Sequence, residues 1–299
     1  MSDARIFALM PVRDYADVLS DSVRCASSWC DRVFVLDNGS TDGSIELVRS
    51  LARELSNVEF LGVDDRPWSY AYYAEIYRRA RSIARPGDWW YRLDADEMVV
   101  DDPRPVLREV RPPYDAVYGS MFCYYLTDDD VRAYESDPEG WLARPIRDRV
   151  RWYRNDWAEL RFVRHRRFAQ WKHHGWREGP MSVWPDMVRV RHFQYRSPEQ
   201  MARRIELRRG RDEWSNEGPQ HQLQFSRPLF PVKGPDRPDW EHLVADRELL
   251  DHDDGGPLRD RPELARRPPP LSSPMRRFVG RSLAATPMYS WLLDRRQLR

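Results

Sequence analysis

The chain has 299 residues, of which 41% are hydrophobic, 12% aromatic and 32% charged, and its formal net charge is +1. The 13 Trp and 14 Tyr residues exclude a disordered chain, because such chains are poor in aromatic side chains. The nearly neutral charge gives no reason to expect nucleic acid as a partner. The length allows one large domain or two modest ones.

The cysteines and the apolar segments indicate a reducing environment. Cys25, Cys30 and Cys123 are odd in number and scattered, which predicts neither a disulfide framework nor a zinc site. Residues 1–10 lack the pattern of a signal peptide, and no window approaches the ~18–20 uninterrupted apolar residues of a membrane span. A cytoplasmic location is therefore expected.

The first hundred residues alternate between short apolar runs and stretches with helical spacing. Strands that alternate with helices predict an α/β fold, here a Rossmann-like and mostly parallel sheet flanked by helices. Thr41 or Asp42 is a natural N-cap for the second helix. The expected strands are 5–10, 32–36, 57–63 and 89–93, and the expected helices are 15–29, 45–55 and 70–84.

Polar side chains follow each of these four strands. Ligands of a parallel sheet bind beyond the carboxyl ends of its strands, so these side chains are expected in one cleft. The four stretches are Pro11–Arg13, Asp37–Asp42, Asp64–Arg66 and Asp94–Glu97.

The stretch Trp89–Glu97 runs from aromatic residues into three carboxylates. Side chains alternate along an extended chain, so Asp94 and Asp96 are expected to point the same way. Neighbouring carboxylates repel each other unless a cation lies between them, and Mg²⁺ or Mn²⁺ prefers such oxygen ligands together with substrate phosphates. The pair predicts a divalent-metal site for a diphosphate; the alternative is an exposed acidic turn.

The octet at residues 37–44, Asp-Asn-Gly-Ser-Thr-Asp-Gly-Ser, and the stretch Leu93–Glu97 about fifty residues later together resemble the family 2 glycosyltransferases of the GT-A fold. The resemblance covers residues 4–100 strongly and extends more weakly to about residue 210. It implies that a sugar is transferred from a nucleoside-diphosphate sugar, typically a UDP-sugar, with Mn²⁺ or Mg²⁺ as cofactor. The acceptor would be a glycan or a lipid-linked glycan.

The resemblance also implies how the donor is held. Pro11 and Arg13 would border the nucleoside, and Asp37 would accept a hydrogen bond from the base. An acidic residue at the end of the third strand, Asp64 or Asp65, would help to hold that base.

The metal site implied by the resemblance draws on both halves of the chain. Asp94 would lie near the ribose and the metal, and Asp96 would be the principal metal ligand. His192, at the end of an alternating strand, would complete the site from the far side of the cleft; the alternative is a half-buried strand histidine.

Inversion by a single displacement needs a general base that deprotonates the acceptor hydroxyl. The family places this carboxylate some sixty to ninety residues after the acidic pair. Asp156, Glu159 and Glu178 fall in this range, and we select Glu159, with Asp156 as the alternative.

The second half of the chain is less regular. Residues 1–214 are predicted to form the catalytic domain, with a nucleotide-binding half at 1–100 and an acceptor half at 101–214. A Pro-rich segment and a basic amphipathic helix over 276–299 would follow, and this helix would dock on its own domain, on a partner chain or on an anionic membrane surface. The expected strands are 114–126, 160–164 and 188–195, and a basic helix is expected over 199–214.

Two other functions are compatible with this architecture. A sugar-nucleotide nucleotidyltransferase would have a Gly-rich phosphate loop after the first strand, but residues 11–15 contain no glycine. A protein that binds a nucleotide or glycan without turnover is the other alternative, and the intact pair Asp94 and Asp96 argues against it.

Overall fold

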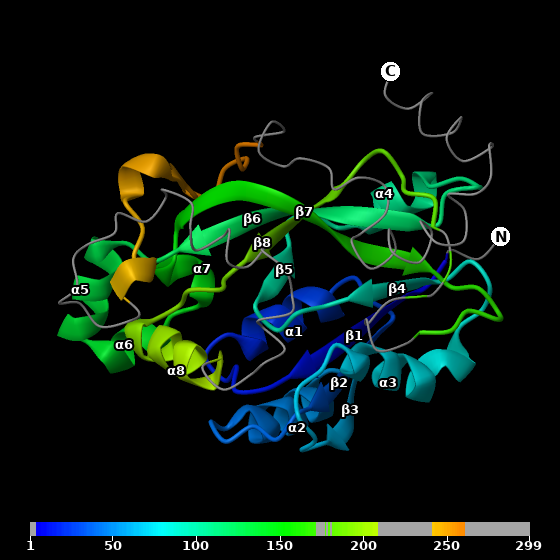
Figure 1. The fold of residues 1–299 in the computed structure, drawn as a ribbon, viewed down its shortest axis with the longest axis horizontal. Helices are drawn as coiled ribbons and strands as arrows, with labels where there is room; N and C mark the ends of the chain where they lie inside the picture. Colours follow the sequence, from blue (N-terminus) through cyan, green and yellow to red (C-terminus); the bar gives the residue numbers. More distant parts are fainter. Residues whose placement is uncertain (1–3, 172–176, 178, 180, 209–240, 261–299) are drawn as a thin grey trace.

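The computed structural model describes residues 4–171, 177, 179, 181–208 and 241–260. Within them, a nine-stranded sheet has the order β3-β2-β1-β4-β7-β6-β8-β5, and β9 pairs with β7. The predicted α/β class is confirmed. In Figure 1, the N-terminal strands (blue) lie in the lower part of the molecule and the long strands β6 and β7 (green) cross the upper part.

The N-terminal half is parallel, as the sequence predicts. In it, β1 pairs with both β2 and β4, and β2 pairs with β3. The elements are β1 (Ile6–Val12), α1 (Leu19–Ser27), β2 (Arg32–Asp37), α2 (Ser44–Glu54), β3 (Val58–Val63), α3 (Ala71–Ala80), the 3₁₀ helix η1 (Arg81–Ile83) and β4 (Trp89–Arg92).

The C-terminal half makes the sheet mixed rather than mostly parallel. The pairs β4–β7, β6–β7 and β5–β8 are antiparallel, whereas β6–β8 is parallel. The strands are β5 (Glu97–Val99), β6 (Ala116–Tyr125), β7 (Trp152–Arg164), β8 (Val188–His192) and β9 (Asp251–His252). Strand β5 was not predicted, because three residues are too short to show a period.

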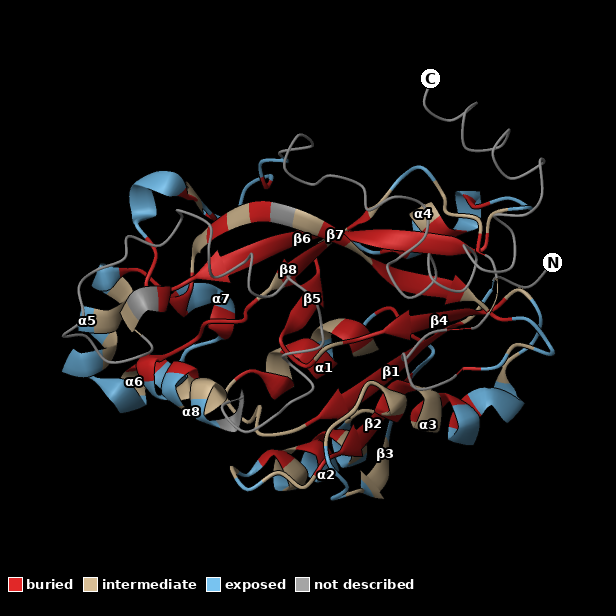
Figure 2. Cartoon of the chain, viewed as in Figure 1, coloured by how far each residue is buried: buried red, intermediate tan, exposed pale blue. Residues whose placement is uncertain are grey.

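Strand β1 is buried along its whole length because helices cover both faces of the sheet. Its residues Ile6, Ala8 and Met10 join a core cluster with α1 and α2. Phe7 and Leu9 join a second cluster with the aromatic face of α3. Figure 2 shows the central strands buried, the edge strand β3 mostly of intermediate exposure, and much of the outer surfaces of the helices exposed.

The N-cap of α2 is Gly43 rather than the predicted Thr41 or Asp42. Gly43 has a φ of 94°, a left-handed conformation that favours glycine. The Asp42 carboxylate instead accepts a hydrogen bond from the Ser44 amide at 3.0 Å.

Residues 131–157 contain short helices that their weak periodicity did not reveal. Strand β7 also begins eight residues before the predicted strand at 160–164. The remaining helices are α4 (Arg104–Glu109), α5 (Asp128–Ser136), α6 (Pro138–Ala143), α7 (Ile146–Arg149), α8 (Pro198–Arg208), and the 3₁₀ helices η2 (Glu241–Leu243) and η3 (Arg247–Leu249). The predicted helix over 276–299 lies outside the described residues.

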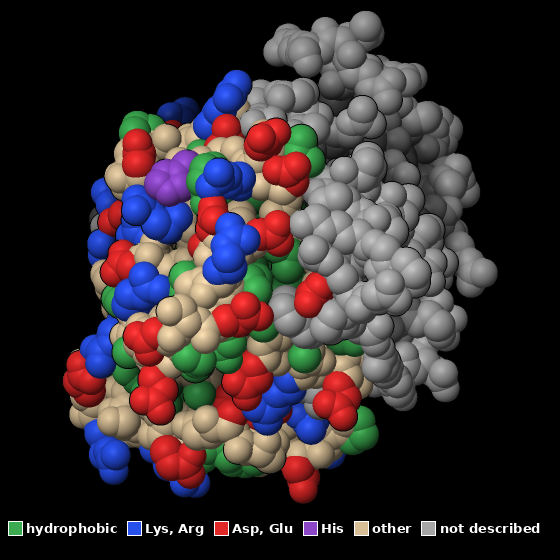
Figure 3. Space-filling model, turned by 90° about the vertical axis from the view of Figure 1, so that its left-hand side faces the viewer, with side chains coloured by type: hydrophobic (Ala, Val, Ile, Leu, Met, Phe, Trp, Pro, Cys, Tyr) green, Lys and Arg blue, Asp and Glu red, His purple; other side chains and the backbone are tan. Residues whose placement is uncertain are grey.

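One end of the molecule carries both acidic and basic side chains on its surface. Figure 3 shows the end of the molecule that carries α5, α6 and α8 in Figure 1, and there acidic and basic side chains are interspersed. Among the described residues, no helix combines the length and apolar character needed to cross a membrane.

Residues 241–260 return to the sheet through a buried polar contact. The Asp253 carboxylate accepts hydrogen bonds from the Tyr124 hydroxyl and from Nε of Arg191, the latter at 3.2 Å. Both charged side chains are only 7% exposed. This contact joins the end of the described chain to β6 and β8.

We predict that Asp253→Ala lowers the free energy of unfolding by about 3 kcal/mol, because it leaves the buried Arg191 guanidinium without its carboxylate. Urea denaturation followed by tryptophan fluorescence measures the change. The matched control is Asp254→Ala, whose exposed carboxylate accepts only a local bond from Gly256, and about 0.5 kcal/mol or less is expected there. Equal losses in the two variants would contradict the assignment.

Candidate functional site

The carboxyl end of β2 supplies the first acidic residue of the candidate cleft. Asp37 is fully buried and pairs in register with Val12 at the end of β1. Its two carboxylate oxygens accept from the amide and the hydroxyl of Ser40, at 2.7 and 2.6 Å. Burial raises the pKa of Asp37, and the bonds from Ser40 oppose this.

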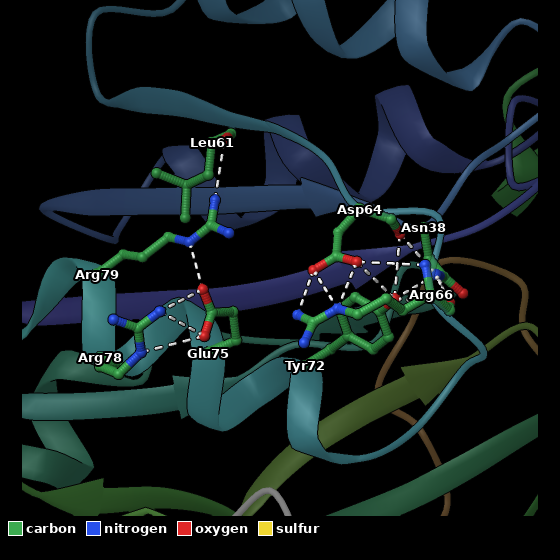
Figure 4. A network of polar contacts seen from close by, with 8 residues as sticks. All are labelled: Asn38, Leu61, Asp64, Arg66, Tyr72, Glu75, Arg78 and Arg79. Atoms are coloured by element: carbon green, nitrogen blue, oxygen red, sulfur yellow. Dashed lines mark hydrogen bonds and ion pairs between the residues drawn. The ribbon is translucent and has the colours of Figure 1, made fainter.

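The octet and the end of β3 are joined by a polar network (Figure 4). The Asn38 side chain donates to the backbone oxygens of Asp64 and Arg66, at 2.8 and 2.7 Å, and lies 2.6 Å from the Tyr72 hydroxyl. Asp64 also binds the Arg66 guanidinium, whose hydrogen bond lowers the pKa of the carboxyl to about 2. Asp64 is therefore occupied by protein groups, whereas its neighbour Asp65 is exposed.

Asp65 lies beside the octet, as the sequence predicts for the two strand ends. A Cβ placed on Gly39 would be 3.6 Å from the Cα of Asp65. On the other side of the octet, Pro11 is buried within β1 and the Arg13 side chain is 32% exposed. The predicted nucleoside contacts thus surround one loop.

The predicted metal ligands Asp96 and His192 face each other. Antiparallel pairing places Glu97 of β5 opposite His192 of β8. The His192 Nε2 atom is 3.6 Å from Oδ1 of Asp96. Burial raises the pKa of Asp96, but His192 and Arg196 outweigh it and leave that pKa below its usual value.

Asp94 is bound by protein groups on both carboxylate oxygens. The hydroxyl of Tyr73, from α3, donates to Oδ1, and Nη2 of Arg161, from β7, is 3.3 Å from Oδ2. Burial raises the pKa of Asp94 to about 6, although Arg161 lowers it. Asp94 is thus a half-buried carboxylate held between the two halves of the chain.

The candidate base Glu159 lies next to this cluster. Its side chain is 37% exposed, and its Oε2 accepts from Nη2 of Arg161 at 3.1 Å. Trp157, two residues earlier on β7, packs edge to face against His192 with ring centroids 5.8 Å apart. Strand β7 therefore presents Glu159 to the region that contains Asp96 and His192.

The alternative base, Asp156, also lies in β7. The pairing with β6 passes from Trp157 to Asn155, so Asp156 is the extra residue of a β-bulge. The Asp156 side chain and residue 178 lie outside the part of the chain that the structure describes.

Sequence reasoning missed three residues that contact the predicted carboxylates, Tyr73, Arg161 and Arg196. It also gave no role to Glu97, whose carboxylate binds Arg161. The buried Arg196 contacts Asp96 at 3.5 Å. The sequence did carry a signal for Arg161, because an arginine stands in the predicted strand at 160–164, two residues after Glu159. Nothing in the sequence marks Tyr73 among the other aromatic residues of α3.

The donor set fits a divalent cation in part. Among the described residues, no three His, Cys, Asp or Glu side chains are arranged to hold a metal. Two atoms 3.6 Å apart, as in Asp96 and His192, can nevertheless both lie ~2.1 Å from one ion. Mg²⁺ typically takes one or two protein carboxylates and completes its shell with substrate phosphate and water.

A cavity of about 590 Å³ does not coincide with this cluster. It is lined by residues of β6, β7 and β8 together with loops, among them Asp101, Ser120, Asn155 and Arg189. None of the predicted site residues lines it. The convergence of titratable side chains marks the candidate site better than this volume does.

No protein-family model and no curated protein sequence matches the chain. Solved structures match over part of it. TarS 1-349 of S. aureus is 10% identical, with 68% of this chain and 64% of that chain covered and a TM-score of 0.35. The mannosyltransferase PcManGT from Pyrobaculum calidifontis, in complex with GDP-Man and Mn²⁺, is 16% identical, with 55% and 45% covered and a TM-score of 0.35.

A third similar structure is GalNAc-T7 with UDP, GalNAc and Mn²⁺, at 13% identity and a TM-score of 0.39, with 65% of this chain and 44% of that chain covered. The chain thus spans less than two thirds of each of these proteins. At these TM-scores the likeness assigns neither substrate nor reaction, and both must come from the chemistry of the site.

Proposed function

We propose that this chain is a metal-dependent glycosyltransferase that moves a sugar from a nucleoside-diphosphate sugar to an acceptor hydroxyl, with inversion. The observation that carries this proposal is one cluster formed by Asp94, Asp96, His192 and Glu159. These residues come from distant parts of the sequence, and they combine a carboxylate and an imidazole 3.6 Å apart with a half-exposed carboxylate.

Asp96 and His192 would hold Mn²⁺ or Mg²⁺, and Asp94 would border the ion and the ribose. A bound divalent cation supplies stabilisation of the charge that develops on the diphosphate leaving group. The contact with Arg196 at 3.5 Å orients the Asp96 carboxylate.

The nucleoside would lie along the strand ends at the octet, with a UDP-sugar as the expected donor. Pro11, Arg13, Asp37 and Asp65 surround this loop. The buried Asp37 carboxylate is positioned by Ser40 to accept from the base, and the exposed Asp65 lies beside the loop at Gly39.

Glu159 would act as the general base. Its carboxylate takes the proton of the acceptor hydroxyl while the acceptor oxygen bonds to the anomeric carbon and the bond from that carbon to the diphosphate oxygen breaks. The acceptor is proposed to be a glycan or a lipid-linked glycan. A peripheral membrane contact or an oligomer through residues 276–299 belongs to the same proposal.

The metal role predicts the behaviour of Asp96→Asn. Removing a charged ligand should lower sugar transfer by about 10²–10³-fold, because the leaving group loses charge stabilisation. Isothermal titration of UDP with and without Mn²⁺ should show that the metal no longer strengthens binding. Asp102→Asn, which removes an exposed carboxylate paired with Arg104, is the control and should behave like wild type. A variant that retains full Mn²⁺-dependent binding and transfer would reject the metal role.

The base assignment predicts a different result for Glu159→Gln. Transfer to the acceptor should fall by about 10²–10⁴-fold, because the acceptor proton has no base to receive it. Titration should still detect Mn²⁺-dependent binding of UDP. If Asp156→Asn loses transfer and Glu159→Gln does not, the base is Asp156. A wild-type protein that binds UDP and Mn²⁺ but consumes no donor with any acceptor mixture would instead be a binding protein.

A further inference from the structure

Arg161 occupies an irregular position in the sheet. Along the β6–β7 ladder, Val117 pairs with Phe162 and Tyr118 pairs with Leu160, so Arg161 is the extra residue of a β-bulge. A bulge of this kind redirects a side chain, and bulges are frequent next to active sites. Arg161 lies two residues after Glu159, so both side chains point to the same side of the strand, and the Arg161 guanidinium contacts the Glu159 carboxylate.

The neighbouring strand leaves room for this side chain. Gly119 lies opposite Glu159 in β6. A Cβ at Gly119 would be 2.9 Å from Cγ of Arg161 and 3.0 Å from Cγ2 of Val190. Such contacts are closer than packed carbon atoms tolerate, so the position of Arg161 depends on a glycine in the adjacent strand.

The guanidinium is anchored to a carboxylate that has no contact with solvent. Nη2 of Arg161 binds Oε1 of Glu97, and the two side chains are 1% and 0% exposed. Burying an ion pair is costly, and apolar residues of similar volume in its place are often as stabilising or more so. Stability alone therefore gives a poor explanation for this pair.

The same nitrogen reaches the two partly exposed carboxylates of the site. Nη2 is 3.1 Å from Glu159 and 3.3 Å from Asp94, whose side chains are 37% and 30% exposed. On its other oxygen, Glu159 is 3.7 Å from Nη1 of Arg92. Asp94 has a separate donor in Tyr73.

We infer that Arg161 and Glu97 are positioning residues that direct the carboxylate of Glu159 toward the acceptor. This inference rests on the proposed function. The buried Glu97 carboxylate binds the Arg161 guanidinium. The guanidinium in turn holds Glu159 beside Asp94, although the carboxylates of Glu159 and Asp94 repel each other. Loss of Arg161 would take from Glu159 a hydrogen-bond donor at 3.1 Å, while the Tyr73 hydroxyl would still bind Asp94.

The test compares Arg161→Met and Arg161→Lys with Arg164→Met. Arg164 lies three residues further along β7 and binds the backbone oxygen of Val110, outside the site. Arg161→Met should lower the kcat of transfer by about 10²-fold, near the lower end of what a general base contributes, and Arg161→Lys should lower it less. The Kd of UDP with Mn²⁺, measured by titration, should change less than about threefold, and Arg164→Met should change neither quantity.

Gly119→Ala keeps every charge but displaces Arg161, so it should show the same fall in kcat with unchanged UDP binding. If Arg161→Met does not fold, the kcat and the UDP affinity of Gly119→Ala still test the inference. Wild-type kcat in both Gly119→Ala and Arg161→Met would overturn the inference. So would a loss of UDP affinity equal to the loss of kcat, because Arg161 would then act on the donor side.

A crystal structure of Arg161→Met, or of Gly119→Ala if Arg161→Met does not fold, separates this inference from the proposed function. Glu159 is expected to turn away from its place beside Asp94. If the wild-type enzyme transfers no sugar, the proposed function fails, and the position of Glu159 in the variant still decides whether Arg161 positions it. An unmoved Glu159 would overturn the inference.

Discussion

Carboxylates from two strands and a turn share one cleft here because guanidinium groups lie between them. Two unit charges ~4 Å apart repel by about 1 kcal/mol in water and by about 4 kcal/mol near a protein surface. Arg161 contacts Asp94, Glu97 and Glu159, and Arg196 contacts Asp96. Without these cations the carboxylates would separate or take up protons.

The fold brings these groups together at β4, the strand where the pairing of the sheet changes from parallel to antiparallel. Strand β4 is parallel to β1 on one side and antiparallel to β7 on the other. The chain leaves β4 through the acidic turn at 94–96 and enters β5, which pairs with β8 and so brings Glu97 opposite His192. The loops proposed to hold the nucleotide thus lie on the parallel side, and the candidate base lies on the antiparallel side.

The sequence predicted the parts of this arrangement that follow local rules. Alternating strands and helices place Asp37 and Asp94 at strand ends, and that alone predicts a shared cleft. The bulge at Arg161 depends on register between β6 and β7, which no local period encodes. Strand β5 is paired with a strand some ninety residues away, so its existence depends on a long-range contact. The helices α5–α7 are too short to repeat an apolar face, so the sequence pattern does not reveal them.

The loop after β1 explains why a metal pair, rather than backbone amides, would carry the diphosphate. A Gly-rich phosphate loop leaves successive amides free to bind oxygen. Here the amides of residues 14–16 donate in turn to the side chains of Ser40, Ser44 and Asp42, at 2.9, 3.0 and 3.0 Å. The octet therefore consumes the donors that a nucleotidyltransferase would need. The negative charge of a bound diphosphate would then have to be balanced elsewhere in the site, and a cation held by Asp96 and His192, as proposed, would balance it.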